Sequence, residues 1–350
     1  MSSVLQCAQK GDDIIIGGGR YKEPAQSSVI NFAFSVLNLK TRQHNLITLD
    51  FLPHGVSLNP NCLTQLIVCE KIGPGAALID LESMTLVETI TTDASRHFYG
   101  HCAYSKSGDV FYTTETYLDS GKGVIVIRDA QSKQVIGEFA SYGTSPHECY
   151  LIDDGNTMIV TNGGGDISGD KPNVSYIDIN SQQLLRQEHL TNRHINAGHL
   201  MLATDGSLIV VSAPRAGLSA DKLGGVSIQP QGKLMRSVSS PKKVVSNMKG
   251  EALSVAIHQN TALVTHPTGN MLTCWSLKDR RLLKRIDLPV PRGVTLSKDK
   301  RYFVVSYGPQ ASVVQIDTQT LELLNMTASH ATYLTGSHLY NWSQMIAGLS

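Results

Sequence analysis

The apolar positions of the chain fall into short runs that end in a polar residue. These runs are LIVCE, FYTTE, MIVTN, LIVVS, ALVTH and FVVSY, and they end at Glu70, Glu115, Asn162, Ser212, His266 and Tyr307. They are rich in Val, Ile and Thr and are separated by Gly, Asp and Ser, which is typical of β-strands and turns. An all-β fold is therefore predicted.

A second set of strands precedes these runs at a regular spacing. Their starts are His54, His101, His147, His199, Leu253, Gly293 and His338, separated by 47, 46, 52, 54, 40 and 45 residues. Tight turns follow the runs, in which Asp80, Asp129, Asp178, Asp317 or Asn38 stands three residues before Ser or Thr. Four antiparallel strands in each of seven repeats predict a seven-bladed β-propeller over residues 1–350, as a single domain.

The two ends of the chain complement each other. Residues 13–50 contain three predicted strands with no inner strand before them, whereas Gly336 to Ile346 offers only an inner strand. We therefore predict that these segments share one blade and close the ring, which also hides exposed strand edges. The stretches 163–173 and 214–225 are interpreted as loop insertions, and 239–250 as a polar connector.

Composition narrows the function classes. Charged residues make up 17% of the chain and the net charge is +1, so no partner is expected among nucleic acids. No apolar stretch approaches the roughly 18 residues of a membrane helix, and membrane insertion is not expected. The first residues lack the basic and apolar regions of a signal peptide. The six cysteines form no CxxC pair, and those near strands are expected to be buried thiols.

Histidines provide the main candidate for chemistry. Five of the seven inner-strand starts are histidine, in a chain with 12 histidines. The start of the first strand and the end of the second share one face of a blade, so these imidazoles should converge at the channel mouth. Neutral imidazoles with nearby carboxylates bind iron, copper or zinc, zinc being the less favoured here. The candidate metal ligands are His54, His101, His147, His199 and His338, with Glu148 or Glu115 as a further ligand or as a group that orients an imidazole.

The polar ends of the second strands are expected to form a rim around that mouth. Its candidates are Glu70, Asn162, His266 and Tyr307. The alternative is that the histidines are structural, since a repeat copies a structural hydrogen-bonding residue as readily as a ligand. Glycine-rich stretches at 17–20 and 162–166 open no helix and do not favour a phosphate site.

The residues of the repeat also resemble a known family. RHFYGHCAYSKSGDVFYTTE, GKGVIVIRDA, SPHECYLIDDGNTMIVTNGGG and the closing SHLYN resemble a bacterial β-propeller family, domain of unknown function 1513. The resemblance implies export by the twin-arginine route and genes located near iron-uptake genes. The family pattern covers Arg96, Phe98, Tyr99, Gly100, His101, Glu115, Pro146, His147, Glu148, Asn162, Gly163, Gly164 and His338.

Two functions from different classes follow. The first is a metal-handling propeller of bacterial iron uptake, binding iron or copper, with a protein of that system as partner. The second is a non-catalytic interaction scaffold with structural histidines. A metal-dependent hydrolase is a third, less favoured function. No catalytic residue is assigned. We expect a monomer, periplasmic if an export signal was removed and cytoplasmic if the sequence is complete as written.

Overall fold

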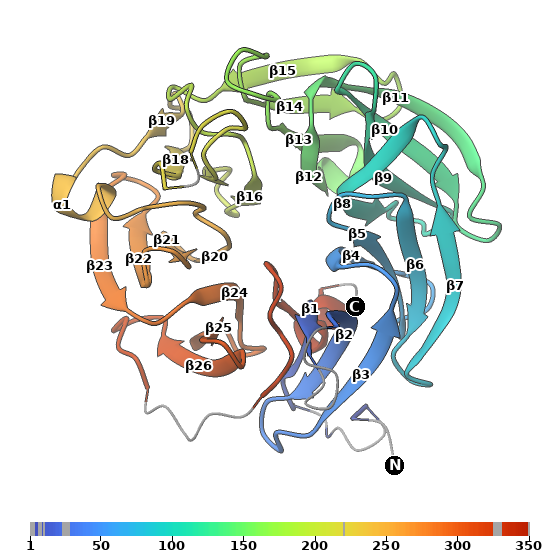
Figure 1. Cartoon of the computed structure of the whole chain (residues 1–350), viewed down its shortest axis with the longest axis horizontal. Coiled ribbons are helices and arrows are strands. Elements are labelled where there is room, and N and C mark those ends of the chain that lie inside the picture. Colours follow the sequence, from blue (N-terminus) through green and yellow to red (C-terminus); the bar gives the residue numbers. More distant parts are fainter. Residues whose placement is uncertain are drawn as a thin grey trace. The chain divides into compact units, whose positions relative to one another are not determined.

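The chain folds as a seven-bladed β-propeller in the computed structural model, as the repeat predicts (Figure 1). The structure describes residues 4–5, 9, 11–22, 29–219, 221–324 and 331–348. Contacts divide the chain into two compact units. Unit 1 comprises Met1–Leu52, His199–Pro214 and Leu218–Ser350, and unit 2 comprises Pro53–Gly198 and Arg215–Gly217.

Unit 2 contains three blades, each a four-stranded antiparallel sheet in chain order. Its strands are β4 (Pro53–Leu58), β5 (Gln65–Glu70), β6 (Gly75–Asp80), β7 (Thr85–Thr91), β8 (Arg96–Tyr104), β9 (Val110–Tyr117), β10 (Lys122–Asp129), β11 (Val135–Thr144), β12 (Pro146–Ile152), β13 (Thr157–Asn162), β14 (Asn173–Asp178) and β15 (Leu184–His189). The middle strands of each blade are apolar on both faces because they are covered on both sides.

Unit 1 contains the other four blades and two short helices, α1 (Lys242–Val245) and α2 (Trp342–Ala347). Its strands are β1 (Ile14–Tyr21), β2 (Asn31–Asn38), β3 (His44–Leu49), β16 (His199–Leu202), β17 (Leu208–Ser212), β18 (Gly225–Gln229), β19 (Arg236–Ser237), β20 (Val255–His258), β21 (Thr261–His266), β22 (Met271–Ser276), β23 (Leu282–Asp287), β24 (Pro291–Leu296), β25 (Tyr302–Tyr307), β26 (Ser312–Asp317) and β27 (Tyr340–Asn341). The sheet of β24 to β26 has three strands and an isolated bridge between Ile316 and Leu323.

The predicted turns between third and fourth strands are confirmed. In each one the Asp side chain accepts hydrogen bonds from the backbone N–H and the hydroxyl of the Ser or Thr three residues later, as Asp129 does from Ser132 (2.6 and 2.8 Å). The next residue has a positive φ, for example Lys133. The short side chain thus stabilises a turn that the backbone alone would make less readily.

The closing blade joins the two ends of the chain. Strand β27 pairs with β1, and the sheet order is β27-β1-β2-β3, so the predicted closure is confirmed (Figure 1). The closing strand is shorter than predicted, because Asn341 accepts a hydrogen bond from Gln344 N and thereby caps helix α2. Residues 342–346 are therefore helical, not part of the predicted strand.

The glycine-rich stretch of β1 accommodates this closing segment. A Cβ at Gly17 would lie 2.6 Å from the carbonyl oxygen of His338, and one at Gly19 would lie 2.0 Å from that of Tyr333. Gly336 N donates to Gly18 O at 2.9 Å. The glycines are therefore needed for close backbone packing.

The two predicted loop insertions are also present, between β13 and β14 and between β17 and β18. Within unit 2, Arg215 is 1% exposed. Its guanidinium donates to the carbonyl oxygens of Gly164 (2.5 Å) and Asp170 (2.8 Å) and to that of Asp166. One buried arginine thus orders the glycine-rich loop after β13, because its planar donor set can satisfy several carbonyls at once.

Asn341 should be a sensitive position for the closure. It is 2% exposed and its Nδ2 donates to Leu296 O (2.9 Å) and to Asp13 Oδ1, in addition to the helix cap. Asn341→Ala removes three part-buried hydrogen bonds, at about 1 kcal/mol each, so urea unfolding should show a loss of about 2–3 kcal/mol. The exposed Asn180→Ala is the control; an equal effect of both variants would contradict this role.

Candidate functional site

Four of the inner strands share a β-bulge. In unit 2 the pairing register shifts between Pro53 and Val56, between Phe98 and Cys102, and between Pro146 and Cys149. In unit 1 it shifts in the same way between Pro291 and Val294. A bulge leaves residues out of the ladder and re-aims their side chains, so the bulged residues are free to serve a site.

In two blades of unit 2, a hydroxyl on the second strand bonds the bulged inner strand; in the blade of β4 the equivalent residue is Cys69. Thr114 Oγ1 accepts from His101 N (3.3 Å) and donates to the carbonyl oxygen of His147 on the following blade (3.1 Å). Thr161 does the same with Glu148 N (2.9 Å) and Gly198 O (2.6 Å). We call this arrangement the hydroxyl clamp. In unit 1, Thr265 Oγ1 joins Ser254 N (3.0 Å) to Arg292 O (2.6 Å).

The ladder register corrects one part of the sequence alignment. The polar ends of the six second strands occupy equivalent positions. In each of these six blades, the residue two positions before this end pairs with one residue of the inner strand, which serves as a common reference. These reference residues are Val56, Cys102, Cys149, Leu200, Val255 and Val294. Counted from these partners, His54 and His147 lie two positions upstream, whereas His101 and His199 lie one position upstream. The histidines therefore occupy two successive positions and not one.

Three histidines of unit 2 form a compact cluster. Their ligand nitrogens lie within 4.8 Å of one another, and the Nε2 atoms of His54 and His147 are 3.2 Å apart. The ring centroids of His54, His101 and His147 are separated by 4.9–5.0 Å. We call these three residues the histidine cluster.

Two glycines make room for the cluster. A Cβ at Gly55 would lie 2.6 Å from Nδ1 of His101, and a Cβ at Gly100 would lie 2.8 Å from Cε1 of His147 and 2.9 Å from Cδ2 of His54. Gly100 also has a φ of 112°, which side chains other than glycine rarely adopt. The backbone is therefore shaped for converging imidazoles.

Hydrogen bonds orient the imidazoles of His147 and His101. His147 Nδ1 lies 2.7 Å from the carbonyl oxygen of Tyr99, so Nδ1 is the donor and Nε2 carries the lone pair. Burial, followed by the neighbouring His101 and Lys71, lowers the pKa of His147 well below its usual value. His147 is therefore a neutral imidazole at neutral pH, with Nε2 directed toward His54.

Glu148 orients His101 in a similar manner. Its Oε1 lies 2.8 Å from His101 Nδ1, and both side chains are buried. A carboxylate that accepts from one ring nitrogen leaves the other nitrogen as the metal ligand. Glu148 was predicted as a ligand or an orienting group, and its position in unit 2 suits the second role.

His199 and His338 belong to unit 1. Their Nε2 atoms are 2.9 Å apart and their ring centroids 4.1 Å apart. His199 Nδ1 lies 2.6 Å from the carbonyl oxygen of Leu253, which again directs Nε2 toward the second imidazole. Unit 1 thus repeats the opposed Nε2 atoms of His54 and His147 on a pair of its own.

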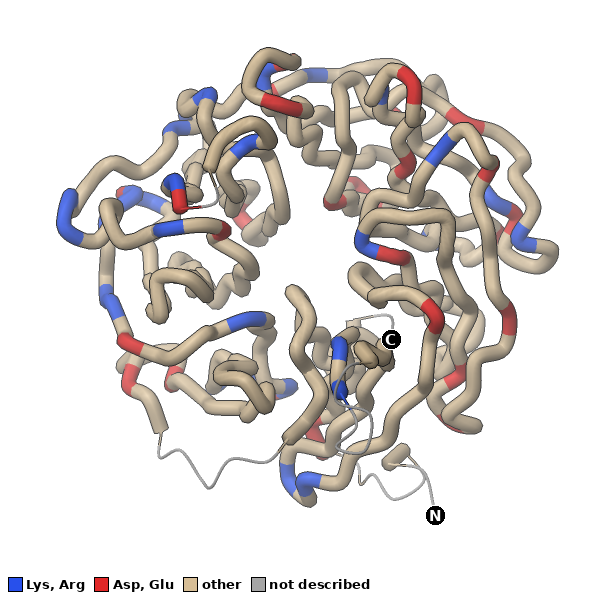
Figure 2. Tube along the Cα trace, in the orientation of Figure 1, with Lys and Arg blue, Asp and Glu red and all other residues tan. Residues whose placement is uncertain are grey.

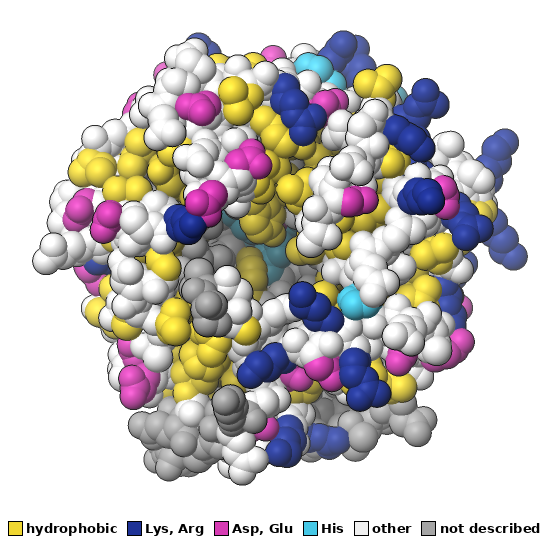
Figure 3. Space-filling model, turned by 180° about the vertical axis from the view of Figure 1, so that it is seen from behind, with side chains coloured by type: hydrophobic (Ala, Val, Ile, Leu, Met, Phe, Trp, Pro, Cys, Tyr) yellow, Lys and Arg dark blue, Asp and Glu magenta, His cyan; other side chains and the backbone are white. Residues whose placement is uncertain are grey.

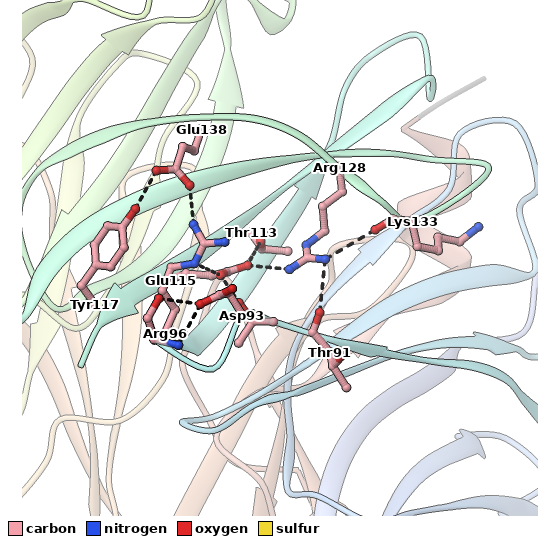
Figure 4. Close-up of polar contacts among 11 residues, drawn as sticks. Thr91, Asp93, Arg96, Thr113, Glu115, Tyr117, Arg128, Lys133 and Glu138 are labelled. Atoms are coloured by element: carbon pink, nitrogen blue, oxygen red, sulfur yellow. Dashed lines mark hydrogen bonds and ion pairs between the residues drawn. The ribbon is translucent and has the colours of Figure 1, made fainter. Parts of the chain in front are cut away.

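The structure places Glu115 in a different cluster (Figure 4). Its carboxylate is fully buried and accepts from Arg128 (2.9 Å), Thr113 (2.8 Å) and Thr92, with Arg96 Nε at 3.3 Å. Arg96 also pairs with Glu138, which accepts from Tyr117 as well. Glu115 thus neutralises two buried arginines, and we leave it out of the proposed metal site.

The predicted rim residues are mostly buried and bonded within their own blades. Asn162 Nδ2 donates to Asn173 Oδ1 (3.0 Å) and to Ser175 Oγ (3.2 Å) of the third strand. His266 Nε2 lies 2.8 Å from Thr273 Oγ1, and Tyr307 is 8% exposed. Glu70 is half-buried and accepts from Gly75 N (3.0 Å), and burial raises the pKa of its carboxyl. We therefore assign these residues to the support of the blades.

Charged side chains of both signs are mixed over the described residues. Lys and Arg are interspersed with Asp and Glu along both units (Figure 2), and both signs occur together on the face seen in Figure 3. Cys69, Cys102, Cys149 and Cys274 are buried free thiols, as predicted, whereas Cys62, also expected to be buried, is a half-buried free thiol. Among the described residues, no helix is long and apolar enough to cross a membrane.

These features define a β-propeller whose chain directs pairs of imidazoles toward each other within each unit. Residues 50–339 match the model of a family described as protein of unknown function (DUF1513), and the chain belongs to this family. The resemblance seen in the sequence is thereby confirmed. No curated protein matches the chain significantly.

Solved structures match the fold. Hydrazine synthase of Kuenenia stuttgartiensis is 13% identical to this chain, with a TM-score of 0.64. The match covers 85% of this chain and 94% of that chain. The dihydro-heme d1 dehydrogenase NirN, in complex with DHE, is 11% identical to this chain, with a TM-score of 0.62. The match covers 99% of this chain and 80% of that chain. At such low identity both comparisons show the fold alone.

Removal of Glu115 should destabilise the protein strongly. Glu115→Ala leaves Arg96 and Arg128 buried without their shared counter-charge, which costs about 3–5 kcal/mol. Denaturant unfolding measures this loss. Glu138, whose side chain is 41% exposed, is the comparison, and Glu138→Ala should cost about 1 kcal/mol or less. Equal losses would contradict a special role of Glu115.

His266 should contribute a pH-dependent term to stability. Burial lowers its pKa to about 3, whereas the unfolded chain binds a proton near pH 6.5. Its contribution is therefore complete above about pH 6.5 and decreases as the pH falls toward 3, by about 2–3 kcal/mol at pH 4.5. The free energy of unfolding of wild type and His266→Gln should differ less at pH 4.5 than at pH 7.5. A constant difference would refute this assignment.

Proposed function

We propose that the histidine cluster of unit 2 binds a divalent transition metal, iron or copper before zinc. The observation that carries the proposal is the convergence of three imidazole nitrogens within 4.8 Å. Two ligand nitrogens at about 2.0–2.1 Å from one ion are roughly 2.9–3.4 Å apart when they are adjacent in its coordination sphere. The 3.2 Å between the Nε2 atoms of His54 and His147 falls in this range.

The tautomers support the same proposal. Tyr99 O fixes the proton of His147 on Nδ1, and Glu148 does so for His101. Such partners on the far nitrogen orient an imidazole and raise its basicity as a ligand. In the absence of metal, a proton between His54 and His147 would occupy the position that the ion takes.

The donor set limits the choice of metal. Imidazole nitrogen suits iron, copper and zinc, whereas calcium and magnesium prefer oxygen ligands. One solved structure with the same fold is named as a dehydrogenase of dihydro-heme d1, which supports testing iron first. The family resemblance further supports a role in bacterial iron uptake, in the periplasm, with a protein of that system as partner.

The test is calorimetry with Fe(II) under anaerobic conditions, Cu(II) and Zn(II), on protein without an affinity tag. Wild type should bind one of these ions tightly, and the variant with His54, His101 and His147 all changed to Ala should lose that binding. Glu148→Gln should lower the affinity about 10–100-fold, because it weakens the orientation of His101. Affinity should also decrease below about pH 6.5, where protons compete for the imidazoles.

The matched control is His189→Ala with His194→Ala, since both residues are exposed in unit 2. This double variant should bind metal as wild type does. Equal, weak binding by wild type and the triple variant would refute metal binding and favour the interaction scaffold, in which the imidazoles only support the inner strands. Circular dichroism of each variant shows that it is folded.

A further inference from the structure

Residues 222–250 of unit 1 carry only positive charge. Both signs occur elsewhere in this unit, but this stretch contains six Lys and Arg and no Asp or Glu, with Asp221 and Glu251 at its two ends. The six are Lys222, Lys233, Arg236, Lys242, Lys243 and Lys249, and all are exposed. We call them the basic patch. The net charge of +1 for the chain conceals it, because unit 2 contains 10 Lys and Arg against 17 Asp and Glu.

The fold brings the basic patch to the outer edge of one blade. Strand β19, which contains Arg236, pairs with β18 at that edge. The chain then returns along β18, because Val238 N donates to Val226 O (2.9 Å) and Leu223 forms a β-bridge with Lys249. Figure 2 shows Lys and Arg at β19 and α1, the elements labelled at this edge in Figure 1. The patch therefore forms the outer surface of this blade.

Packing beneath the basic patch holds its backbone in place. Helix α1 buries Val244 in the apolar core of the blade and leaves its two lysines exposed. Arg280, in the turn before β23, donates from Nε to Ile228 O (3.0 Å) and from Nη2 to Leu234 O. These bonds fix the hairpin between β18 and β19, so the charges are displayed from an ordered surface.

The members of the basic patch form no ion pair with a described residue. By contrast, Lys284 and Arg285 of the neighbouring strand β23 pair with Glu322 (2.5 Å) and Asp287 (2.8 Å). Like charges displayed together on one edge repel one another, and an anionic partner offsets this repulsion.

The composition of the stretch favours one kind of anionic partner. Five of the six cations are Lys, and residues 222–250 contain no Phe, Tyr or Trp. Protein interfaces are depleted in Lys and enriched in aromatic residues, and single-stranded nucleic acids are bound by stacking on aromatic rings. Leu234 is 72% exposed and Leu223 is 40% exposed among these lysines. Lysines around exposed apolar side chains are typical of binding to an anionic membrane surface.

We infer that the basic patch binds the surface of an anionic lipid bilayer, with Leu234 inserted between the headgroups. Lysines act as point charges on flexible stems, which suits the mobile phosphates of lipid headgroups. This contact is peripheral, and it goes beyond the proposed function because it uses no residue of the histidine cluster.

The test is co-sedimentation of EDTA-treated protein with vesicles made of equal parts phosphatidylcholine and phosphatidylglycerol, and with vesicles of phosphatidylcholine alone. Wild type should bind the mixed vesicles at least tenfold more tightly, and this binding should weaken as NaCl is raised from about 0.05 M to about 0.5 M. Lys242→Glu with Lys243→Glu should weaken it at least tenfold. Leu234→Ser should cause a smaller loss that persists at high salt, because it removes an apolar contact.

The matched control is Lys122→Glu with Lys171→Glu, two exposed lysines of unit 2 whose replacement changes the net charge equally. This variant should bind as wild type does. Thermal unfolding shows whether each variant is folded; if the patch variant is not, Lys242→Gln with Lys243→Gln replaces it and should also weaken binding. Three outcomes overturn the proposal: equal binding to both kinds of vesicle, equal losses in patch and control variants, or tighter binding of a DNA duplex than of the mixed vesicles.

Discussion

The hydroxyl clamp is the interaction on which the inner strands depend. A bulge removes backbone groups from the ladder, and a buried N–H or carbonyl without a partner costs about 1–3 kcal/mol. Thr114 and Thr265 each satisfy an N–H of one blade and a carbonyl of the next, and Thr161 bonds Glu148 N and Gly198 O. In the blade of β8 the same hydroxyl therefore supports the bulge that displays His101 and ties this blade to the strand of His147.

Much of the fold could be predicted from the sequence because its repeat is local. The polar ends of the second strands and the Asp turns follow from residues a few positions apart, and the closure follows from comparing the first and last repeats; the structure confirms all three. The clamp also left a signal: Thr or Ser precedes Glu115, Asn162, His266 and Tyr307. Its role could not be recognised, because the acceptor lies on the following blade.

The site was harder to predict because a bulge hides the register. His54 and His101 look equivalent in sequence but differ by one position, and a shift of one residue changes where a side chain points. Glu115 illustrates a second limit. Its acidic character suggested a ligand, whereas Arg128, thirteen residues away on the next strand, neutralises it in the core. Such a pairing depends on tertiary packing and has no local pattern.

The complementary glycines place a constraint on how the histidine cluster can change. Gly100 faces His54 and His147, and Gly55 faces His101, so each imidazole occupies the volume that a methyl group on the neighbouring blade would fill. Each of these glycines therefore leaves the space that a histidine of a neighbouring blade occupies. A side chain at Gly100 would displace two imidazoles at once, so the cluster can be lost by substituting a residue that offers no ligand atom.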